Sequence, residues 1–138
     1  MAIDWGERRI GLALSDERQL LAQPLTTLTR RAGKRFPMQE LVALLQHHAV
    51  TGVVLGLPLD ADGAEGTSAG EVRGLAADVA RRATLPVDLW DERMTTARAL
   101  QAVREMGGTT RGRREDVDTL AATVLLQHYL DARRGGAT

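Results

Sequence analysis

The sequence predicts an α/β fold with a mixed five-stranded sheet that is flanked by helices. Apolar residues alternate along the first part of the chain, which is typical of half-buried strands in hairpins. Two later apolar runs are short and continuous, which is typical of strands covered on both faces. Segments with helical spacing alternate with these runs, so strand–helix units follow three antiparallel N-terminal strands. The chain has 138 residues, a length that fits a single domain over residues 1–138.

The N-terminal part predicts three strands. Residues 1–16 are expected to form two short strands around a turn at residues 5–8. In the second of these, apolar side chains alternate from Ile10 to Leu14, as a half-buried strand requires. A third strand is expected over residues 23–28.

The middle of the chain predicts helices and strands in alternation. A helix is expected from Met38, directly after a proline, and a buried strand over residues 51–57. The loop over residues 58–70 is rich in Gly and acidic residues, and the next helix is expected to begin at Ser68 or Gly70. The expected inward positions are Leu41, Leu44, Leu45 and His48 in the first helix and Val72, Leu75, Ala76 and Val79 in the second.

The last third adds one more strand and two helices. A buried strand is expected over residues 86–90, a helix over 95–106, a loop over 107–114 and a final helix over 116–132. The expected inward face of the final helix is Val117, Leu120, Ala121, Val124, Leu125 and His128.

Composition excludes several classes of protein. The chain has no cysteine, which excludes disulfides, thiolate zinc sites and cysteine nucleophiles. Eighteen basic residues balance eighteen acidic ones, which excludes a strongly basic nucleic-acid coat. No apolar run reaches the ~20 residues of a membrane span, and the N-terminus lacks a signal-peptide pattern. We therefore expect a soluble cytoplasmic protein.

Carboxylates occur where three predicted elements begin or end. Asp4 ends the first strand, Asp91 and Glu92 end the fifth, and Asp116 and Asp118 open the last helix. Ligands of open α/β sheets bind beyond the carboxyl ends of strands, and clustered carboxylates there suit hard divalent cations. Two such cations can drive phosphodiester cleavage. Spacing alone leaves other roles open for each acid: a turn cap, a solvated strand end or a helix N-cap.

Two other groups of residues have simpler interpretations. Asp60, Asp62 and Glu65 around Gly63 resemble a calcium loop only weakly, so a turn is favoured. The chain has only four aromatic residues, too scattered in the sequence to predict a base-stacking platform. These aromatic residues are Trp5, Phe36, Trp90 and Tyr129.

Four stretches, taken together and in order, resemble one protein family. They are Asp4–Asp16, Gly56–Leu59 with Asp62–Gly63, Asp91–Thr96 and Val117–Ala122. The family is RuvX, also called YqgF: bacterial pre-16S rRNA nucleases, also described as Holliday-junction-resolvase-like. The resemblance covers nearly the whole chain.

The resemblance implies an RNase H-like fold and Mg²⁺- or Mn²⁺-dependent hydrolysis of nucleic-acid phosphodiesters at a two-metal site. It makes Asp4, Glu92 and Asp118 the catalytic and metal-binding acids, with Asp4 bridging the two ions. Glu115 precedes Asp118 by three residues and is a candidate extra ligand. Asp16 belongs to the first motif but is interpreted as structural.

Basic residues near these acids are candidate phosphate contacts, although each could also be part of a solvated loop. The candidate nucleic-acid-binding residues are Arg8, Arg9, Arg93, Arg111, Arg113 and Arg114. A second basic group is expected farther from the site. It consists of Arg30, Arg31, Lys34 and Arg35.

The leading functional hypothesis is a metal-dependent nuclease that processes the end of pre-16S ribosomal RNA in ribosome biogenesis. One alternative is resolvase-like or exonuclease activity on DNA in recombination or repair. Another is a non-catalytic scaffold that binds nucleic acid or a transcription factor. The expected partner is structured RNA, such as an rRNA precursor, or branched DNA, with no membrane. A monomer and a homodimer both remain open.

Overall fold

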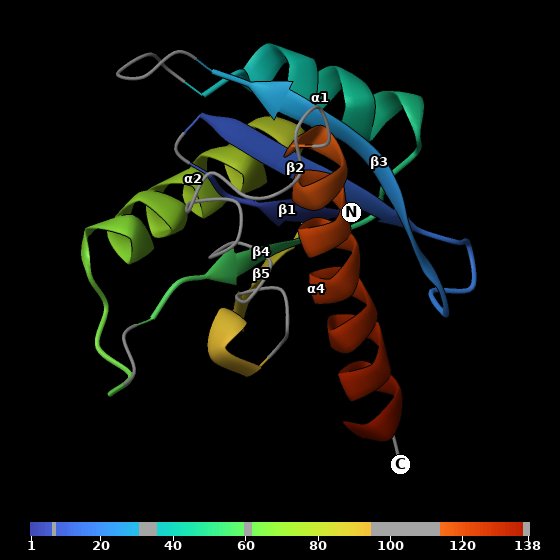
Figure 1. Ribbon diagram of the computed structural model, residues 1–138. Helices are drawn as coiled ribbons and strands as arrows, with labels where there is room; N and C mark the ends of the chain where they lie inside the picture. Colours follow the sequence, from blue (N-terminus) through green and yellow to red (C-terminus); the bar gives the residue numbers. More distant parts are fainter. Residues whose placement is uncertain (7, 31–35, 60–61, 95–113, 137–138) are drawn as a thin grey trace.

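The computed structural model describes residues 1–6, 8–30, 36–59, 62–94 and 114–136, and its sheet has the strand order β3-β2-β1-β4-β5 (Figure 1). β1 pairs antiparallel with β2, and β2 with β3, whereas β1–β4 and β4–β5 are parallel. The mixed five-stranded sheet is therefore confirmed. The strands are β1 (Ala2–Asp4), β2 (Arg9–Ser15), β3 (Ala22–Thr29), β4 (Val53–Leu57) and β5 (Val87–Asp91).

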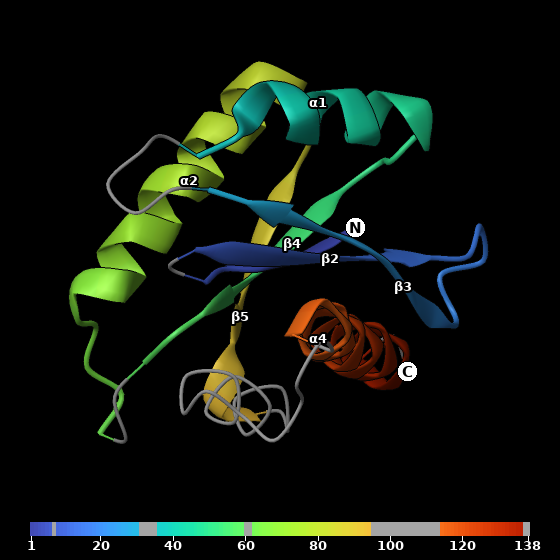
Figure 2. The same cartoon turned by 45° about the horizontal axis from the view of Figure 1, so that its top comes forward.

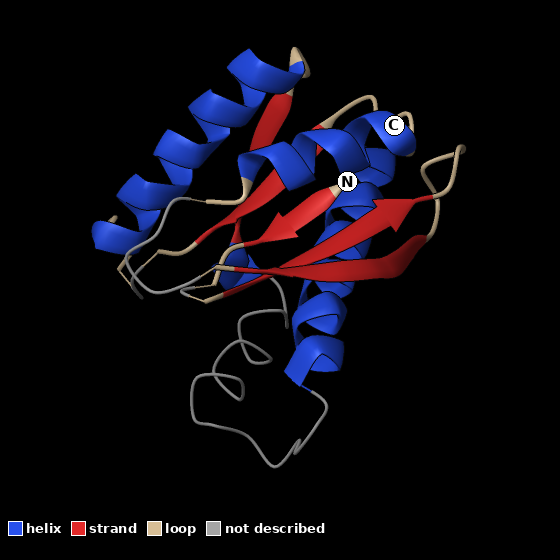
Figure 3. Cartoon of the chain, turned by 90° about the horizontal axis from the view of Figure 1, so that it is seen from above, coloured by secondary structure: helices blue, strands red, loops and turns tan. Residues whose placement is uncertain are grey.

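Helices cover both faces of the sheet. Figure 2 shows α1 and α2 on one face and α4 on the other. In Figure 3 the two shorter helices lie on the near side of the strands and α4 crosses behind them. The predicted helix over residues 95–106 lies outside the described residues. The helical elements are α1 (Met38–His47), α2 (Thr67–Ala83), the short 3₁₀ helix η1 (Glu92–Met94) and α4 (Arg114–Gly136).

Side chains separate into two cores because successive residues of a strand point to opposite faces. Ile3 of β1 packs with Leu55 of β4 in the core beneath α1 and α2. Ala2 packs with Val54 and with Leu125 of α4 in the core on the other face. Asp4 follows Ile3, so strand alternation directs it to the face that α4 covers.

The face beneath α4 carries small side chains, which let the helix approach the sheet closely. Ala2 and Ala13 from the strands and Ala122 from α4 are all buried in this core. Gln127 then ties α4 to the β2–β3 hairpin: its Oε1 accepts from the Ala22 N–H at 2.8 Å. These contacts fix the helix over the strand that carries Asp4.

Several predicted boundaries and faces differ from the structure. β5 is only half-buried, because it is the outermost strand of the sheet and has a neighbouring strand on one side only. α2 begins at Thr67, and α4 runs two residues earlier and four later than the predicted 116–132. His48 lies beyond α1 and is exposed.

The inward face of α4 was predicted only in part. Leu125 is buried as expected, but Leu120 is 48% exposed and His128 is only half-buried. Leu126 and Leu130 are buried instead, so the buried stripe is rotated about the helix axis relative to the predicted one. Among the described residues, no helix combines the length and apolarity needed to cross a membrane.

Candidate active site at the carboxyl edge of the sheet

The parallel strands β1, β4 and β5 end at one edge of the sheet, and two acids lie there. Asp4 is the last residue of β1, and Glu92 directly follows β5. Asp4 is 0% exposed and Glu92 is 2% exposed, and they are the only charged residues buried in the described part of the chain. The structure therefore brings two predicted site residues to the same buried edge.

Asp4 is flanked by glycines on both neighbouring strands. It pairs with Gly11 of β2, and its neighbour Ile3 pairs with Leu55 of β4, which places Gly56 beside it. Residues at the same level of adjacent strands share a face, so neither neighbour adds a side chain next to the carboxylate. On the face that α4 covers, the two strand positions next to Asp4 therefore carry no side chain.

The carboxylate of Glu92 lies directly over Gly56. A Cβ atom added at Gly56 would lie 2.2 Å from Glu92 Oε1 and 2.6 Å from Leu125 Cδ1. Glu92 thus fills the space that a side chain on β4 would occupy, next to a leucine of α4. The turn of η1 makes this possible, because it redirects the chain at the end of β5. Gly56 is required here for packing, a role that its place in a predicted strand did not reveal.

Asp91 and Arg93, on either side of Glu92, form a partly exposed ion pair. Arg93 donates from its backbone N–H to Asp91 Oδ1 at 3.0 Å and from Nη2 to Oδ2 at 2.8 Å. This hydrogen-bonded pair raises the pKa of Arg93, and the charge of Asp62 adds to the effect. The guanidinium also lies 3.5 Å from a Cβ position at Gly63. Arg93 is therefore held at the rim of the site by Asp91.

The other predicted site residues are placed only in part. Arg9 shares a strand face with Gly11 and so lies on the same side as Asp4, whereas Arg8 is exposed in the turn. Asp118 lies within α4, but its side chain is outside the described part. Among the described residues, which do not include the Asp118 side chain, no group of three or more potential metal ligands occurs. The remaining candidates outside the described side chains are Glu115, Asp116, Arg111, Arg113 and Arg114.

The loop after β4 is a turn, as predicted. Asp62 Oδ1 accepts from the Ala64 N–H at 3.0 Å, and Gly63 has a positive φ of 87° that suits glycine. Glu65 is paired with Arg73 of α2 at 2.9 Å. These two described acids are engaged in the turn and in an ion pair, whereas Asp60, the third acid of the weak calcium-loop resemblance, lies outside the described residues.

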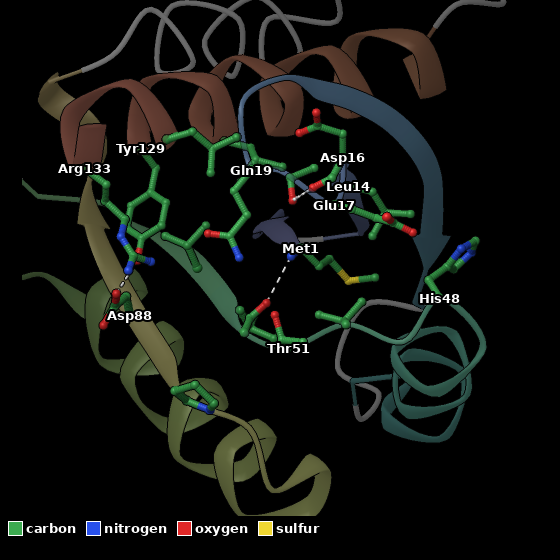
Figure 4. A pocket seen from close by; sticks show the side chains of 18 of the residues that line it. Met1, Leu14, Asp16, Glu17, Gln19, His48, Thr51, Asp88, Tyr129 and Arg133 are labelled. Atoms are coloured by element: carbon green, nitrogen blue, oxygen red, sulfur yellow. Dashed lines mark hydrogen bonds between the residues drawn. The ribbon is translucent and has the colours of Figure 1, made fainter. Parts of the chain in front are cut away.

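The opposite edge of the sheet holds a pocket of about 600 Å³ (Figure 4). Tyr129 donates a hydrogen bond to Asp88 there, and Arg133 lies over the tyrosine ring. Asp16 also lines this pocket and accepts from the Leu20 N–H at 2.7 Å. No sequence pattern predicted this pocket, whose residues come from the amino ends of β1, β4 and β5, from the end of β2 with the turn that follows it, and from the far half of α4. Neither Asp4 nor Glu92 lines it.

A family model described as RuvX, Holliday junction resolvase, matches residues 1–132. The chain belongs to the RuvX family. A RuvX relative from Chloroflexus aurantiacus, named "Putative pre-16S rRNA nuclease", is 40% identical over 134 residues, which cover 97% of this chain and 87% of the relative. A relative of the same name from Myxococcus xanthus is 41% identical, over 97% of this chain and 88% of its own length. Family membership identifies this RuvX chain as a nuclease.

Solved structures support the RNase H-like fold of RuvX. Thermus thermophilus RuvC in complex with a Holliday junction substrate matches with a TM-score of 0.54 at 18% identity. The match covers 96% of this chain and 93% of RuvC. A second structure of Thermus thermophilus RuvC gives a TM-score of 0.53 at 19% identity, over 96% of this chain and 94% of RuvC. At this identity the likeness shows the fold.

Proposed function

We propose that this RuvX protein is a divalent-metal-dependent nuclease whose catalytic acids are Asp4, Glu92 and Asp118. The observation that carries the proposal is the burial of Asp4 and Glu92 at one sheet edge, 0% and 2% exposed. Withdrawing two carboxylates from water is costly unless positive charge compensates them. Bound divalent cations would supply this positive charge, so a metal site accounts for two carboxylates buried at one edge.

The residues at this edge fit a hard divalent cation. Carboxylate oxygens are the ligands that Mg²⁺ and Mn²⁺ prefer. Gly11 and Gly56 place no side chain beside Asp4, and the Glu92 carboxylate occupies the space over Gly56, which brings it toward Asp4. When bound, such cations supply Lewis-acid activation of water and of the leaving oxygen. Asp4 and Glu92 would hold them, so the chain itself needs no covalent nucleophile.

Helical spacing supports Asp118 as the third acid. Asp118 precedes Ala121 by three residues and Leu125 by seven within α4, and both of these side chains are buried. Positions separated by three, four and seven residues share one face of a helix. Glu115 precedes Asp118 by one further turn and is the proposed extra ligand. Arg9 and Arg93 would contact the phosphates of the substrate.

The proposed substrate is the end of precursor 16S rRNA, in ribosome biogenesis in the cytoplasm. The names of relatives about 40% identical over nearly the whole chain support this substrate. The structure of RuvC with a Holliday junction favours a second candidate, cleavage of branched DNA. Both candidates use the same carboxylates, so they differ in the surface that binds the strand.

The test compares two labelled substrates, a precursor-rRNA end and a four-way DNA junction, with Mg²⁺, Mn²⁺ or a chelator. We expect metal-dependent cleavage of the RNA that Asp118→Asn reduces by at least about 100-fold, because even outer-shell partners of metals contribute 10- to 100-fold. Asp131→Asn is the matched control: Asp131 lies on the same helix but is exposed and paired with Arg134.

Three outcomes would change the assignment. Preferred cutting of the junction would select the DNA candidate. Cleavage that survives in the chelator, or in Asp118→Asn, would remove the proposed metal site. Binding without any cleavage by the folded protein would favour a non-catalytic scaffold.

A further inference from the structure

Trp5, Arg30 and Phe36 form an aromatic–arginine cluster beside the candidate active site. The ring centroids of Trp5 and Phe36 are 5.7 Å apart and their planes differ by 16°, a stacked arrangement. The Arg30 guanidinium carbon lies 4.3 Å from the centre of the Trp5 ring. The three residues are half-buried and come from three separate segments, which is why the scattered aromatic residues predicted no cluster.

The backbone fixes Arg30 near the turn that follows Asp4. Its N–H donates to the Arg8 carbonyl oxygen at 2.8 Å, and the preceding residue pairs with Arg9 in the β2–β3 ladder. Trp5 directly follows Asp4 in the chain. Arg30 was expected in a basic group farther from the site, and the structure instead places it at the same edge of the sheet. The other members of that group lie outside the described residues.

Arg30 and Arg9 lie on opposite faces of this edge. Trp5, beneath Arg30, packs against the core under α1 and α2, whereas Arg9 is on the α4 face with Asp4. A strand of nucleic acid that crosses the edge toward Asp4 would therefore meet a cation on each side. Balanced overall charge makes such local placement decisive, because the protein has no general basic surface to attract phosphate.

Stacking suits Arg30 for binding phosphate. The Arg30 guanidinium carbon lies over the Trp5 ring, a cation–π contact that uses the face of the guanidinium, whereas hydrogen bonds to phosphate oxygens use the N–H groups at its edge. The contact also restricts the long side chain, so less entropy is lost on binding. A purely structural role would be to shield Trp5 from water, and the experiment below separates the two roles.

We propose that Arg30, held over Trp5, binds a backbone phosphate of single-stranded RNA next to the acidic site. The inference rests on the proposed function and names a subsite for its substrate. Trp5 and Phe36 are positioning residues, since they orient the guanidinium. The subsite lies on the α1–α2 side of the edge, so it would hold a part of the strand that Asp4 and Glu92 do not contact.

The test measures binding of a labelled single-stranded RNA by fluorescence anisotropy in chelator, over a series of salt concentrations. We expect Arg30→Gln to raise Kd by about 5- to 10-fold at low salt and to lower the slope of log K against log salt by about 0.7. Arg18→Gln is the matched control, because Arg18 is exposed in the β2–β3 turn at the opposite edge. It removes the same charge and should leave both quantities unchanged.

Two further variants separate positioning from charge. Arg30→Lys keeps the charge, so the salt slope should return while Kd stays raised, because an ammonium does not stack in the same way. Trp5→Leu leaves every charge in place and should also raise Kd. Unfolding temperatures of all variants are measured alongside, so that a folding defect is not taken for weak binding. A DNA strand of the same sequence shows whether the subsite requires RNA.

The outcomes distinguish this inference from the proposed function. Equal Kd and slope for Arg30→Gln and Arg18→Gln would overturn the subsite even if the protein cleaves RNA, as would no binding by the wild type at low salt. Arg30-dependent binding without metal-dependent cleavage would overturn the nuclease proposal and leave the subsite in place. Preference for the DNA strand would overturn the assignment to RNA.

Discussion

At the carboxyl edge of the sheet, Asp4 and Glu92 are withdrawn from water, whereas Asp16 and Asp88 at the amino edge stay in contact with it. The amino-edge acids have local roles. Asp16 accepts from the backbone N–H groups of Leu20 and Leu21 and so closes the β2–β3 turn. Asp88 accepts from the hydroxyl of Tyr129. Both edges thus carry carboxylates, but only one buries them.

Under the proposed function, this difference separates acids that serve the fold from acids that serve a site. Capping a turn at the surface adds stability at a small desolvation cost, since water still reaches the carboxylate. Burial of Asp4 and Glu92 brings two like charges to one edge of the sheet, an arrangement whose cost functional sites commonly carry. Substitution of the buried acids at the carboxyl edge should therefore lower activity and spare stability. Substitution of Asp16 at the amino edge should lower stability and spare activity.

The largest expected effect comes from Asp4→Asn. Removing one carboxylate from the proposed metal site should lower metal-dependent cleavage by at least about 100-fold. The metal-free variant should unfold at the same or a higher temperature, because one of two like charges at this buried edge has been removed. Cleavage assays and thermal unfolding in chelator measure the two effects. A variant with near-normal cleavage would show that the carboxyl edge is not catalytic.

Gly56→Ala tests the packing of the site without changing a charge. The new methyl group would lie 2.2 Å from Glu92 Oε1 and 2.6 Å from Leu125 Cδ1, so the Glu92 carboxylate and the Leu125 side chain must shift. We expect a loss of roughly 1–3 kcal/mol in unfolding free energy, typical of overpacking, together with impaired cleavage. Urea denaturation and the cleavage assay measure these changes.

Gly74→Ala is the matched control for that substitution. Gly74 lies within α2, and a Cβ atom there would meet nothing within 4 Å. Alanine should stabilise the helix by about 0.5–1 kcal/mol and leave cleavage unchanged. Equal behaviour of the two alanine variants would mean that Glu92 does not depend on the space above Gly56.

Periodicity and turn chemistry predicted the elements of this edge, because both depend on local sequence. The strands ending at Asp4 and near Glu92 and the helix carrying Asp118 follow from short apolar patterns. The inward face of α4 was harder: Leu120 is exposed although its spacing matched the predicted stripe. Several apolar stripes are compatible with one helix, and the choice depends on how it crosses the sheet.

Contacts between distant segments were beyond what local patterns can predict. Gly56 is an ordinary strand glycine in the sequence, and only the fold places Glu92 over it. Arg30 and Phe36 are separated in the sequence from Trp5, and the cluster forms because the ends of β1 and β3 lie at the same edge. The resemblance to RuvX made Asp4 and Glu92 candidate site residues, but it did not predict the groups that position them.

Asp16→Asn should affect stability at the amino edge and spare activity. Backbone hydrogen bonds from Leu21 and Leu20 lower the pKa of Asp16 below its ordinary value of 3.8. A lowered folded-state pKa means that the carboxylate stabilises the protein above about pH 3.8, and that this contribution is lost as the pH falls through the folded-state value. The variant should therefore be less stable than the wild type at neutral pH, with the difference shrinking in acid.

Urea denaturation at several pH values, paired with the cleavage assay at neutral pH, measures this effect. Glu17→Gln is the control, because Glu17 is its exposed neighbour in the same turn. A stability difference for Asp16→Asn that stays constant from neutral to acidic pH would contradict a role for the charged carboxylate. A large loss of cleavage would contradict the functional separation of the two edges.

The smallest expected effect concerns Tyr129, the only tyrosine of the chain. Burial raises the pKa of Tyr129 above the ordinary value of 10.0, and the hydrogen bond that it donates to Asp88 raises it further. Ultraviolet absorbance should therefore show phenolate formation with a midpoint above 10.0. Asp88→Asn should lower that midpoint, because the negative acceptor is gone, and should leave cleavage unchanged.

A wild-type midpoint at or below the ordinary value would mean that Tyr129 is not held against Asp88. A loss of cleavage in Asp88→Asn would instead connect this pocket to catalysis, and the two edges could no longer be treated as independent.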